Sequence, residues 1–185
     1  MGKTAFIFPG QGAQFVGMGK DFYDNFSVAR EVFDRADESL GRYISKLCFE
    51  GPEEELIKTE NTQPAILATS IAIYKALQKE GIDFEYAAGL SLGEYTALVS
   101  ADAFELEEAL PLVEKRGKLM QETVPLGKGG MAAVLGLDKE KVEEAIDRVK
   151  DFGVVEIANY NCPGQIVISG ERDVLKLAAE EAKKL

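Results

Sequence analysis

Three residues near the middle of the chain have the spacing of a nucleophilic serine site. Gly89, Ser91 and Gly93 form the pattern Gly-x-Ser-x-Gly, after a short apolar run and before a helical pattern. A strand, a sharp turn and a helix of this kind form a nucleophile elbow, which raises the serine hydroxyl clear of the sheet. Glycine is expected on both sides because the neighbouring backbone leaves no room for a side chain. The pattern therefore predicts that Ser91 is a nucleophile.

The groups around this serine decide whether it is chemically active. The helix that follows Ser91 would direct its free N–H groups at a developing oxyanion. A serine nucleophile also needs a base, most often histidine, and the chain contains no histidine. The alternative interpretation is a serine that only caps a helix in a glycine-rich turn.

A second glycine-rich loop follows the first predicted strand. Within Pro9–Gln14, Gly10 and Gly12 permit a close approach of the backbone to another group. A dinucleotide-binding loop would need a third glycine where Phe15 stands, so that interpretation is disfavoured. The loop is better explained as one that presents a backbone N–H to a ligand.

One small basic cluster stands out in an acidic chain. The net charge is −11, which argues against a general nucleic-acid binder. Lys115, Arg116 and Lys118 lie together in a predicted helix. They form either a local anion site or a solvated helix face, with Arg116 an ordinary surface arginine in the second case.

The elements that must position these residues alternate between strands and helices. We expect a buried strand at 4–8 and a buried helix from Thr62 to about 80, ended by Gly81. A strand at 86–90, a helix at 92–100 and a helix at 104–124 kinked by Pro111 follow. Shorter helices are expected after an N-cap at Ser27, over 44–49, and from Pro52.

The pattern changes in kind at the glycines of 127–130. Strands are expected over 131–137, 154–158 and 165–168, with helices from the Asp138 cap and over 171–185, and a turn over Asn161–Gly164. This β-α-β-β-α order is that of a split βαβ module without its last strand. A sheet edge would then lie open.

Bulk properties place the chain among ordinary globular proteins. Its 185 residues are 46% hydrophobic, and no apolar run is long enough to span a bilayer. No signal-peptide pattern is present, and Cys48 and Cys162 lack metal-ligand spacing. We expect a cytoplasmic protein with no metal site, no membrane contact and no nucleic-acid partner.

Four motifs together carry a family resemblance. They are FPGQGAQ at 8–14, GLSLGEY at 89–95, KRGKLM at 115–120 and NYNCPGQ at 159–165. In this order they resemble the malonyl-CoA:acyl carrier protein transacylases of bacterial fatty acid synthesis, and the resemblance covers the whole chain. Leu90 departs from the many relatives that have histidine at that position.

The resemblance implies an α/β fold with two parts. A hydrolase-like large domain with a parallel sheet and the nucleophile elbow would cover 1–126, and an inserted ferredoxin-like α+β subdomain would cover 127–185. Both would be incomplete, because the catalytic histidine and the closing strands of the family lie beyond this sequence. The chain would then be roughly the N-terminal three-fifths of an enzyme, either one piece or one of two companion chains.

Site roles follow from the resemblance by position. Ser91 matches the nucleophile, and the backbone N–H groups of Gln11 and Leu92 match the oxyanion hole. Arg116 matches the arginine that pairs with the free malonyl carboxylate, a task suited to a planar guanidinium. Asn159 and Asn161 match a turn near the coenzyme.

The function implied is ping-pong transfer of a malonyl group. Coenzyme A enters as a thioester substrate, acyl carrier protein is the partner, and no cofactor is needed. This piece alone would be inactive for want of the base. Two alternatives remain, a serine esterase or lipase that uses the same elbow and a non-catalytic fragment that binds acyl carrier protein.

Overall fold

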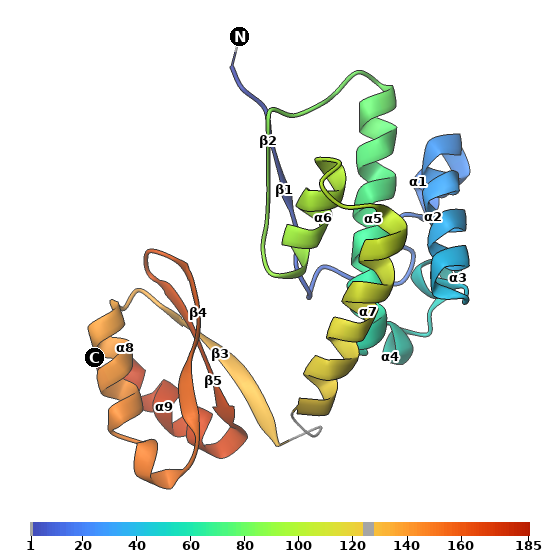
Figure 1. The fold of residues 1–185 in the computed structure, drawn as a ribbon. Coiled ribbons are helices and arrows are strands. Elements are labelled where there is room, and N and C mark those ends of the chain that lie inside the picture. The colour runs from blue at the N-terminus through green and yellow to red at the C-terminus, as the bar shows by residue number, and fades with distance from the viewer. Residues whose placement is uncertain (1, 124–127) are drawn as a thin grey trace. The chain divides into compact units, whose positions relative to one another are not determined.

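The computed structural model describes residues 2–123 and 128–185. They form an α/β protein in which two compact units, Met1–Gln121 and Glu122–Leu185, each have their own core (Figure 1). The boundary expected between residues 126 and 127 lies outside the described residues.

The first unit packs its helices against one face of a small parallel sheet. Strands β1 and β2 pair in parallel, with Ala5 opposite Tyr86 and Phe8 opposite Gly89. Parallel strands need a long crossover, which the intervening helices provide. The elements in chain order are β1 (Ala5–Phe8), α1 (Lys20–Asn25), α2 (Ser27–Leu40), α3 (Ile44–Glu50), α4 (Glu53–Leu56), α5 (Thr59–Lys79), β2 (Tyr86–Gly89), α6 (Leu92–Ser100) and α7 (Leu106–Thr123).

Strand β1 forms as expected, but the prediction that it is buried is wrong. On one face Phe8 is buried, and the ring centroid of Phe6 lies 6.0 Å from that of Tyr74 of α5. On the other face Ile7 is 80% exposed. Parallel sheets are usually covered on both faces, but the described helices cover only one face of this one.

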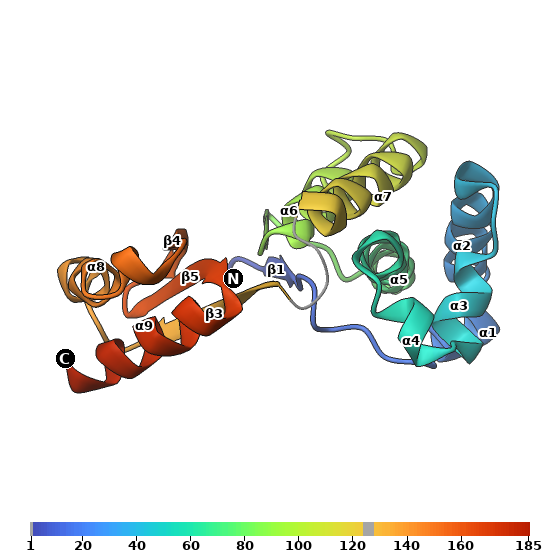
Figure 2. The ribbon, with the colours of Figure 1, turned by 90° about the horizontal axis from the view of Figure 1, so that it is seen from below.

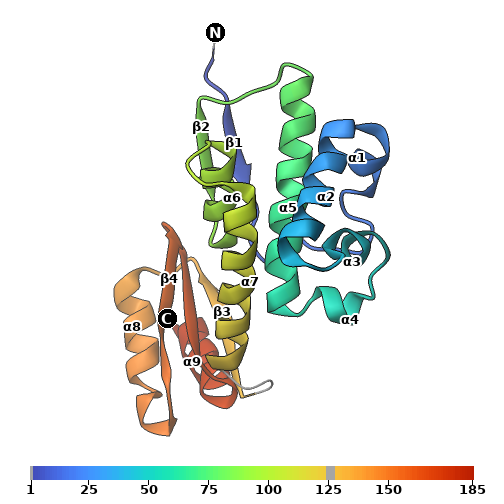
Figure 3. The same ribbon diagram turned by 45° about the vertical axis from the view of Figure 1, so that its right-hand side comes forward.

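Helix α5 lies at the centre of the first unit. Every residue from Asn61 to Thr69 is buried, as expected for a helix that is apolar on most sides. In Figures 2 and 3 it runs beside α2, and Figure 2 shows α6 and α7 on its opposite side.

The predicted start of α5 at Thr62 is wrong, because the helix begins at Thr59 and contains Pro64. Proline is typical of the first helical position, but here burial outweighs the one hydrogen bond that an interior proline removes. The predicted end is confirmed. Gly81 has φ +80°, its N–H donates to the Gln78 carbonyl at 3.0 Å, and the Ile82 N–H donates to the Leu77 carbonyl at 3.0 Å.

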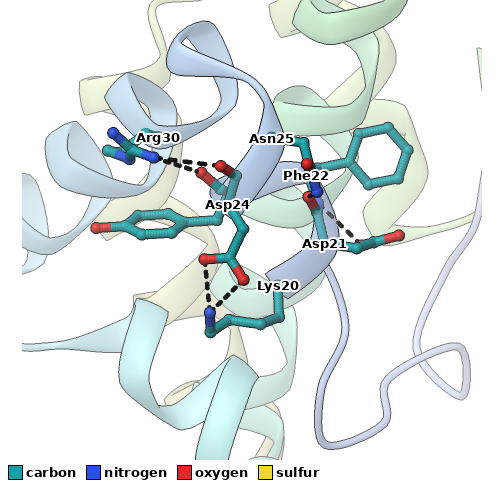
Figure 4. A network of polar contacts seen from close by, with 7 residues as sticks. Lys20, Asp21, Phe22, Asp24, Asn25 and Arg30 are labelled. Carbon is teal, nitrogen blue, oxygen red and sulfur yellow. Dashed lines mark hydrogen bonds and ion pairs between the residues drawn. The ribbon is translucent and has the colours of Figure 1, made fainter.

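Short helix α1 is held by polar contacts at both ends (Figure 4). Lys20 Nζ pairs with Asp24 Oδ1 at 2.6 Å, and Arg30 of α2 donates to the carbonyl oxygens of Tyr23 and Asp24 at 3.3 and 3.4 Å. The cation thus satisfies carbonyls at the C-terminal end of α1. Ser27 is the first residue of α2 and not its cap, which corrects the predicted N-cap. Phe26 occupies the cap position without a side-chain bond.

The second unit packs two helices on an antiparallel sheet. Its elements are β3 (Gly129–Leu135), α8 (Lys139–Asp147), the short 3-10 helix η1 (Lys150–Phe152), β4 (Val155–Cys162), β5 (Gln165–Glu171) and α9 (Arg172–Lys184), and the strand order is β3-β5-β4. Alternate residues Ile166 and Ile168 of β5 are buried in the core with residues of α8 and α9. The predicted cap is confirmed, since Asp138 Oδ1 accepts from the Lys141 N–H at 3.0 Å.

Candidate active site

Ser91 sits on the sharp turn between β2 and α6. Its backbone has φ 55° and ψ −103°, a conformation that residues with a side chain rarely adopt, and the residue is exposed. A Cβ on Gly89 would lie 1.9 Å from the Gly93 carbonyl carbon, and one on Gly93 would lie 2.3 Å from the Phe8 carbonyl oxygen. Only glycine fits at both positions, which is the geometry of a nucleophile elbow.

The loop after β1 contacts this turn. A Cβ on Gly10 would lie 2.7 Å from the Leu90 carbonyl oxygen, and the Leu90 N–H donates to the Phe8 carbonyl at 3.3 Å. The N–H groups of Gln11 and Leu92 donate to no protein acceptor within residues 2–123 and 128–185. Leu92 is the first residue of α6, so its N–H has no partner within the helix. Within the described residues, both N–H groups are therefore unpaired in the protein.

Arg116 of α7 reaches the serine directly. Its Nη2 donates to Ser91 Oγ at 3.0 Å, and its Nη1 donates to Gln63 Oε1 at 2.7 Å. The guanidinium carbon lies 5.6 Å from the centroid of the Tyr95 ring. Two of the five guanidinium N–H donors are thus used, which leaves enough for a bidentate carboxylate.

Two residues of the basic cluster, Lys118 and Arg116, have different surroundings. Lys118 Nζ pairs with Glu114 at 3.0 Å on the solvated side of α7, whereas Arg116 points at Ser91. The surface interpretation therefore holds for Lys118 and is wrong for Arg116.

Sequence reasoning missed Gln63 and Tyr95. Gln63 is completely buried, and its amide nitrogen lies 3.4 Å from the sulfur of Met120. A glutamine inside a buried helix is unusual, because a buried polar group needs a partner, and that was the available signal. Tyr95 had the weaker signal of lying one helical turn after Ser91.

Asn159 and Asn161 lie in the second unit. Both belong to strand β4, and Asn161 Nδ2 donates to Gln165 Oε1 of β5 at 3.0 Å. The predicted turn over Asn161–Gly164 is therefore too long, since only Pro163 and Gly164 connect the strands. Pairing with β5 extends β4 further than its apolar pattern indicated.

The part of the chain that the structure describes has no group of three or more His, Cys, Asp and Glu residues arranged to hold a metal. Within the same residues, no helix is both long and apolar enough to cross a bilayer.

Comparison with known proteins gives consistent matches. The family model described as "Acyl transferase domain" matches residues 5–184. The chain is 51% identical over 185 residues to the malonyl CoA-acyl carrier protein transacylase of Bacillus subtilis (strain 168), and 47% identical over 186 residues to that of Staphylococcus aureus (strain MRSA252). All of this chain is covered, but it spans only 58% and 60% of those relatives' lengths.

Comparison with solved structures finds proteins of the same kind. The malonyl CoA-acyl carrier protein transacylase of Clostridium perfringens matches with a TM-score of 0.91 and 53% identity, over 99% of this chain and 58% of that one. A malonyl-transacylase in complex with its type II PKS acyl-carrier protein matches with a TM-score of 0.90 and 44% identity, over 99% of this chain and 60% of that one.

Proposed function

Since the chain belongs to the acyl transferase domain family, we propose that it carries the nucleophile and the carboxylate-binding group of a malonyl-CoA:acyl carrier protein transacylase. One observation carries the proposal: a guanidinium nitrogen lies 3.0 Å from the hydroxyl oxygen of a serine on a strained elbow and donates a hydrogen bond to it. Such a cation beside a nucleophile suits an acyl donor that bears a free carboxylate.

The proposed reaction has two transfers. Ser91 Oγ attacks the thioester carbonyl of malonyl-CoA, the carbon–sulfur bond breaks, and coenzyme A leaves as the thiol with the serine's proton. The phosphopantetheine thiol of acyl carrier protein then attacks the seryl ester, and Ser91 regains a proton as its carbon–oxygen bond breaks. No cofactor takes part. The N–H groups of Gln11 and Leu92 stabilise the oxyanion in both steps, each by about 3 kcal/mol.

Arg116 holds the malonyl carboxylate in this scheme. The remaining guanidinium donors bind the carboxylate beside the contact of Arg116 with Ser91, so binding of substrate also changes the environment of the hydroxyl. Asn159 and Asn161 remain proposed coenzyme contacts from the second unit. The first unit would form the hydrolase-like domain (1–126) and the second the ferredoxin-like subdomain (127–185), in a cytoplasmic enzyme.

The base is the group that this chain does not supply. It contains no histidine, and we propose that the base comes from polypeptide outside these 185 residues, in the same or a companion chain. The chain alone should then turn over slowly, if at all, and an external base should help. Imidazole is expected to accelerate the malonylation of Ser91 by malonyl-CoA, followed by intact mass, and to have no effect on Ser91→Ala.

Binding tests the carboxylate site without any need for a base. Malonyl-CoA should bind the chain at least about tenfold more tightly than acetyl-CoA, because a charged hydrogen-bonded pair contributes roughly 1.5–3 kcal/mol. Titration calorimetry of both esters measures the ratio. Arg116→Ala should bring the ratio near one, and Lys115→Ala, on the same helix, should leave it unchanged. Equal binding of the two esters to the wild-type chain would contradict the proposal.

The same titrations separate the alternatives. A serine esterase for neutral substrates needs no guanidinium at the hydroxyl, so it predicts that Arg116→Ala leaves the ratio unchanged. If the chain only binds acyl carrier protein, acyl carrier protein should bind to it while Ser91 is never acylated, with or without imidazole.

A further inference from the structure

The N-terminal part of α5, from Thr59 to Gln63, contacts both proposed halves of the site. Thr59 Oγ1 accepts from Gln11 Nε2 at 3.3 Å, so this part of α5 contacts the loop that carries one oxyanion donor. Four residues further along α5, Gln63 accepts from Arg116 at 2.7 Å. One short segment of a buried helix therefore contacts residues 11 and 116, which are remote in sequence.

Gly117 determines how closely α7 approaches this part of α5. Gly117 is buried, and a Cβ there would lie 2.6 Å from the Thr59 carbonyl oxygen and 2.7 Å from Glu60 Cα. These are backbone atoms, which cannot rotate aside as the end of a side chain can. Any larger residue would therefore push α7 away from α5 or turn it about its axis.

The position of Arg116 depends on that approach. Arg116 immediately precedes Gly117, and its hydrogen bond to the buried Gln63 is possible only if the helices stay close. Glutamine is a neutral partner, so it orients the guanidinium without cancelling its charge. The full positive charge stays available to a carboxylate.

We propose that Gly117 and Gln63 are positioning residues, which set the Arg116 guanidinium at its distance from Ser91 and thereby set selectivity for carboxylate-bearing acyl groups. The inference rests on the proposed function and deepens it. It assigns a specificity role to residues that contact no substrate. Thr59 lies against both the loop of Gln11 and the helix of Arg116.

The direct test replaces Gly117 with alanine. Gly117→Ala should reduce the preference for malonyl-CoA over acetyl-CoA by about tenfold, because a displaced guanidinium loses its charged hydrogen bonds to the carboxylate. Binding of acetyl-CoA should change little. Calorimetry measures both esters, and Lys115→Ala is the matched control because it changes the neighbouring exposed position of α7.

A double variant separates positioning from general damage. If Gly117 acts through Arg116, then Arg116→Ala/Gly117→Ala should show the same ester ratio and the same malonyl-CoA affinity as Arg116→Ala alone. A further loss of affinity for both esters would mean that the alanine merely disrupts the fold, and would overturn the inference.

A second variant avoids the backbone clash, in case Gly117→Ala does not fold. Gln63→Met keeps the length of the side chain and removes its acceptor, so it should also lower the preference for malonyl-CoA. Thr59→Val removes the contact with Gln11, so it should lower the rate of imidazole-assisted Ser91 malonylation and leave that preference intact. An unchanged preference in Gln63→Met overturns the inference, as does a lost preference in Thr59→Val. Failure of the proposed function looks different, because the wild-type chain would then show no preference.

Discussion

Ser91 is held in a backbone conformation that costs free energy. Its φ of 55° with ψ −103° lies outside the regions open to residues with a Cβ. Strain of this kind costs of order 1–3 kcal/mol and persists only where the surrounding structure imposes it. Here the imposing contacts are those of Gly89 and Gly93 with their neighbours, which leave the turn no alternative course.

Replacing Ser91 with glycine should relieve this strain. We expect Ser91→Gly to be more stable than Ser91→Ala by about 1 kcal/mol, since alanine keeps the clash and glycine removes it, even after the larger unfolded-state entropy of glycine. Urea unfolding of the two variants measures the difference. If alanine proves the more stable, the turn is not strained in solution.

Gln63 is uncharged, and a single substitution can test whether this matters for substrate binding. In Gln63→Glu a carboxylate would form an ion pair with Arg116 and compete with the substrate for it. Affinity for malonyl-CoA should fall at least about tenfold, with acetyl-CoA binding little affected. The variant should also recover some malonyl-CoA affinity at acidic pH, as the new carboxyl is protonated. A pH-independent loss would indicate a steric effect instead.

Ion pairs join α7 to α2 and to the residues that follow α2. Arg35 hydrogen-bonds Glu107, and Arg42 Nε donates to Glu114 Oε1 at 3.0 Å. The bond from Arg35 lowers the pKa of the Glu107 carboxyl. Burial alone would raise the pKa of Glu114, but hydrogen bonds from Lys118 and Arg42 outweigh it and the pKa is lowered.

These two lowered pKa values make the stability of the fold depend on pH. Both carboxyls have a lower pKa in the folded than in the unfolded chain, so they stabilise the fold above the ordinary value of 4.5. The contribution is lost as the pH falls through the folded pKa. Glu107→Gln/Glu114→Gln should therefore be less stable than wild type at pH 7, and the gap in urea midpoint should narrow between pH 5 and 3.

Glu54→Gln is the control for this titration. Glu54 is exposed on α4 and makes no ion pair among the described residues. Its replacement should leave the urea midpoint close to wild type across the range, because isolated surface charges contribute little. A gap that stays constant with pH in the double variant would show that the ion pairs of Glu107 and Glu114 do not form in solution.

At the scale of the molecule, the first unit has one open sheet face. Ala5, Ile7, Tyr86 and Ala88 share it, and all are exposed. Apolar side chains on a sheet face without cover promote self-association. The opposite face is closed by aromatic packing, so neighbouring residues of β1 have very different surroundings.

Adjacent residues of β1 should therefore respond in opposite ways. Ile7→Thr should reduce dye binding to apolar surface and self-association, with stability within about 0.5 kcal/mol of wild type. Phe8→Ala, at a buried position, should cost about 3–5 kcal/mol. Light scattering and urea unfolding measure the two effects. A large destabilisation by Ile7→Thr would mean that this face is covered in solution.

The sequence by itself determined the features that short-range backbone sterics control. The elbow at Ser91, the cap at Asp138 and the glycine end of α5 at Gly81 all follow from residues within five positions of each other. Local geometry admits few residue types at such points, so the residue types in the sequence predict the local backbone structure. The motifs around Ser91 and Arg116 also indicated the family that the comparisons found.

Only the tertiary structure decided which distant groups meet. The contact between Arg116 and Gln63 joins residues 53 positions apart, and the exposure of Ile7 depends on which face the helices cover. The start of α5 at Thr59 likewise depended on burial that outweighs the cost of Pro64. In each case the deciding free energy comes from packing between elements, which no local pattern in the sequence records.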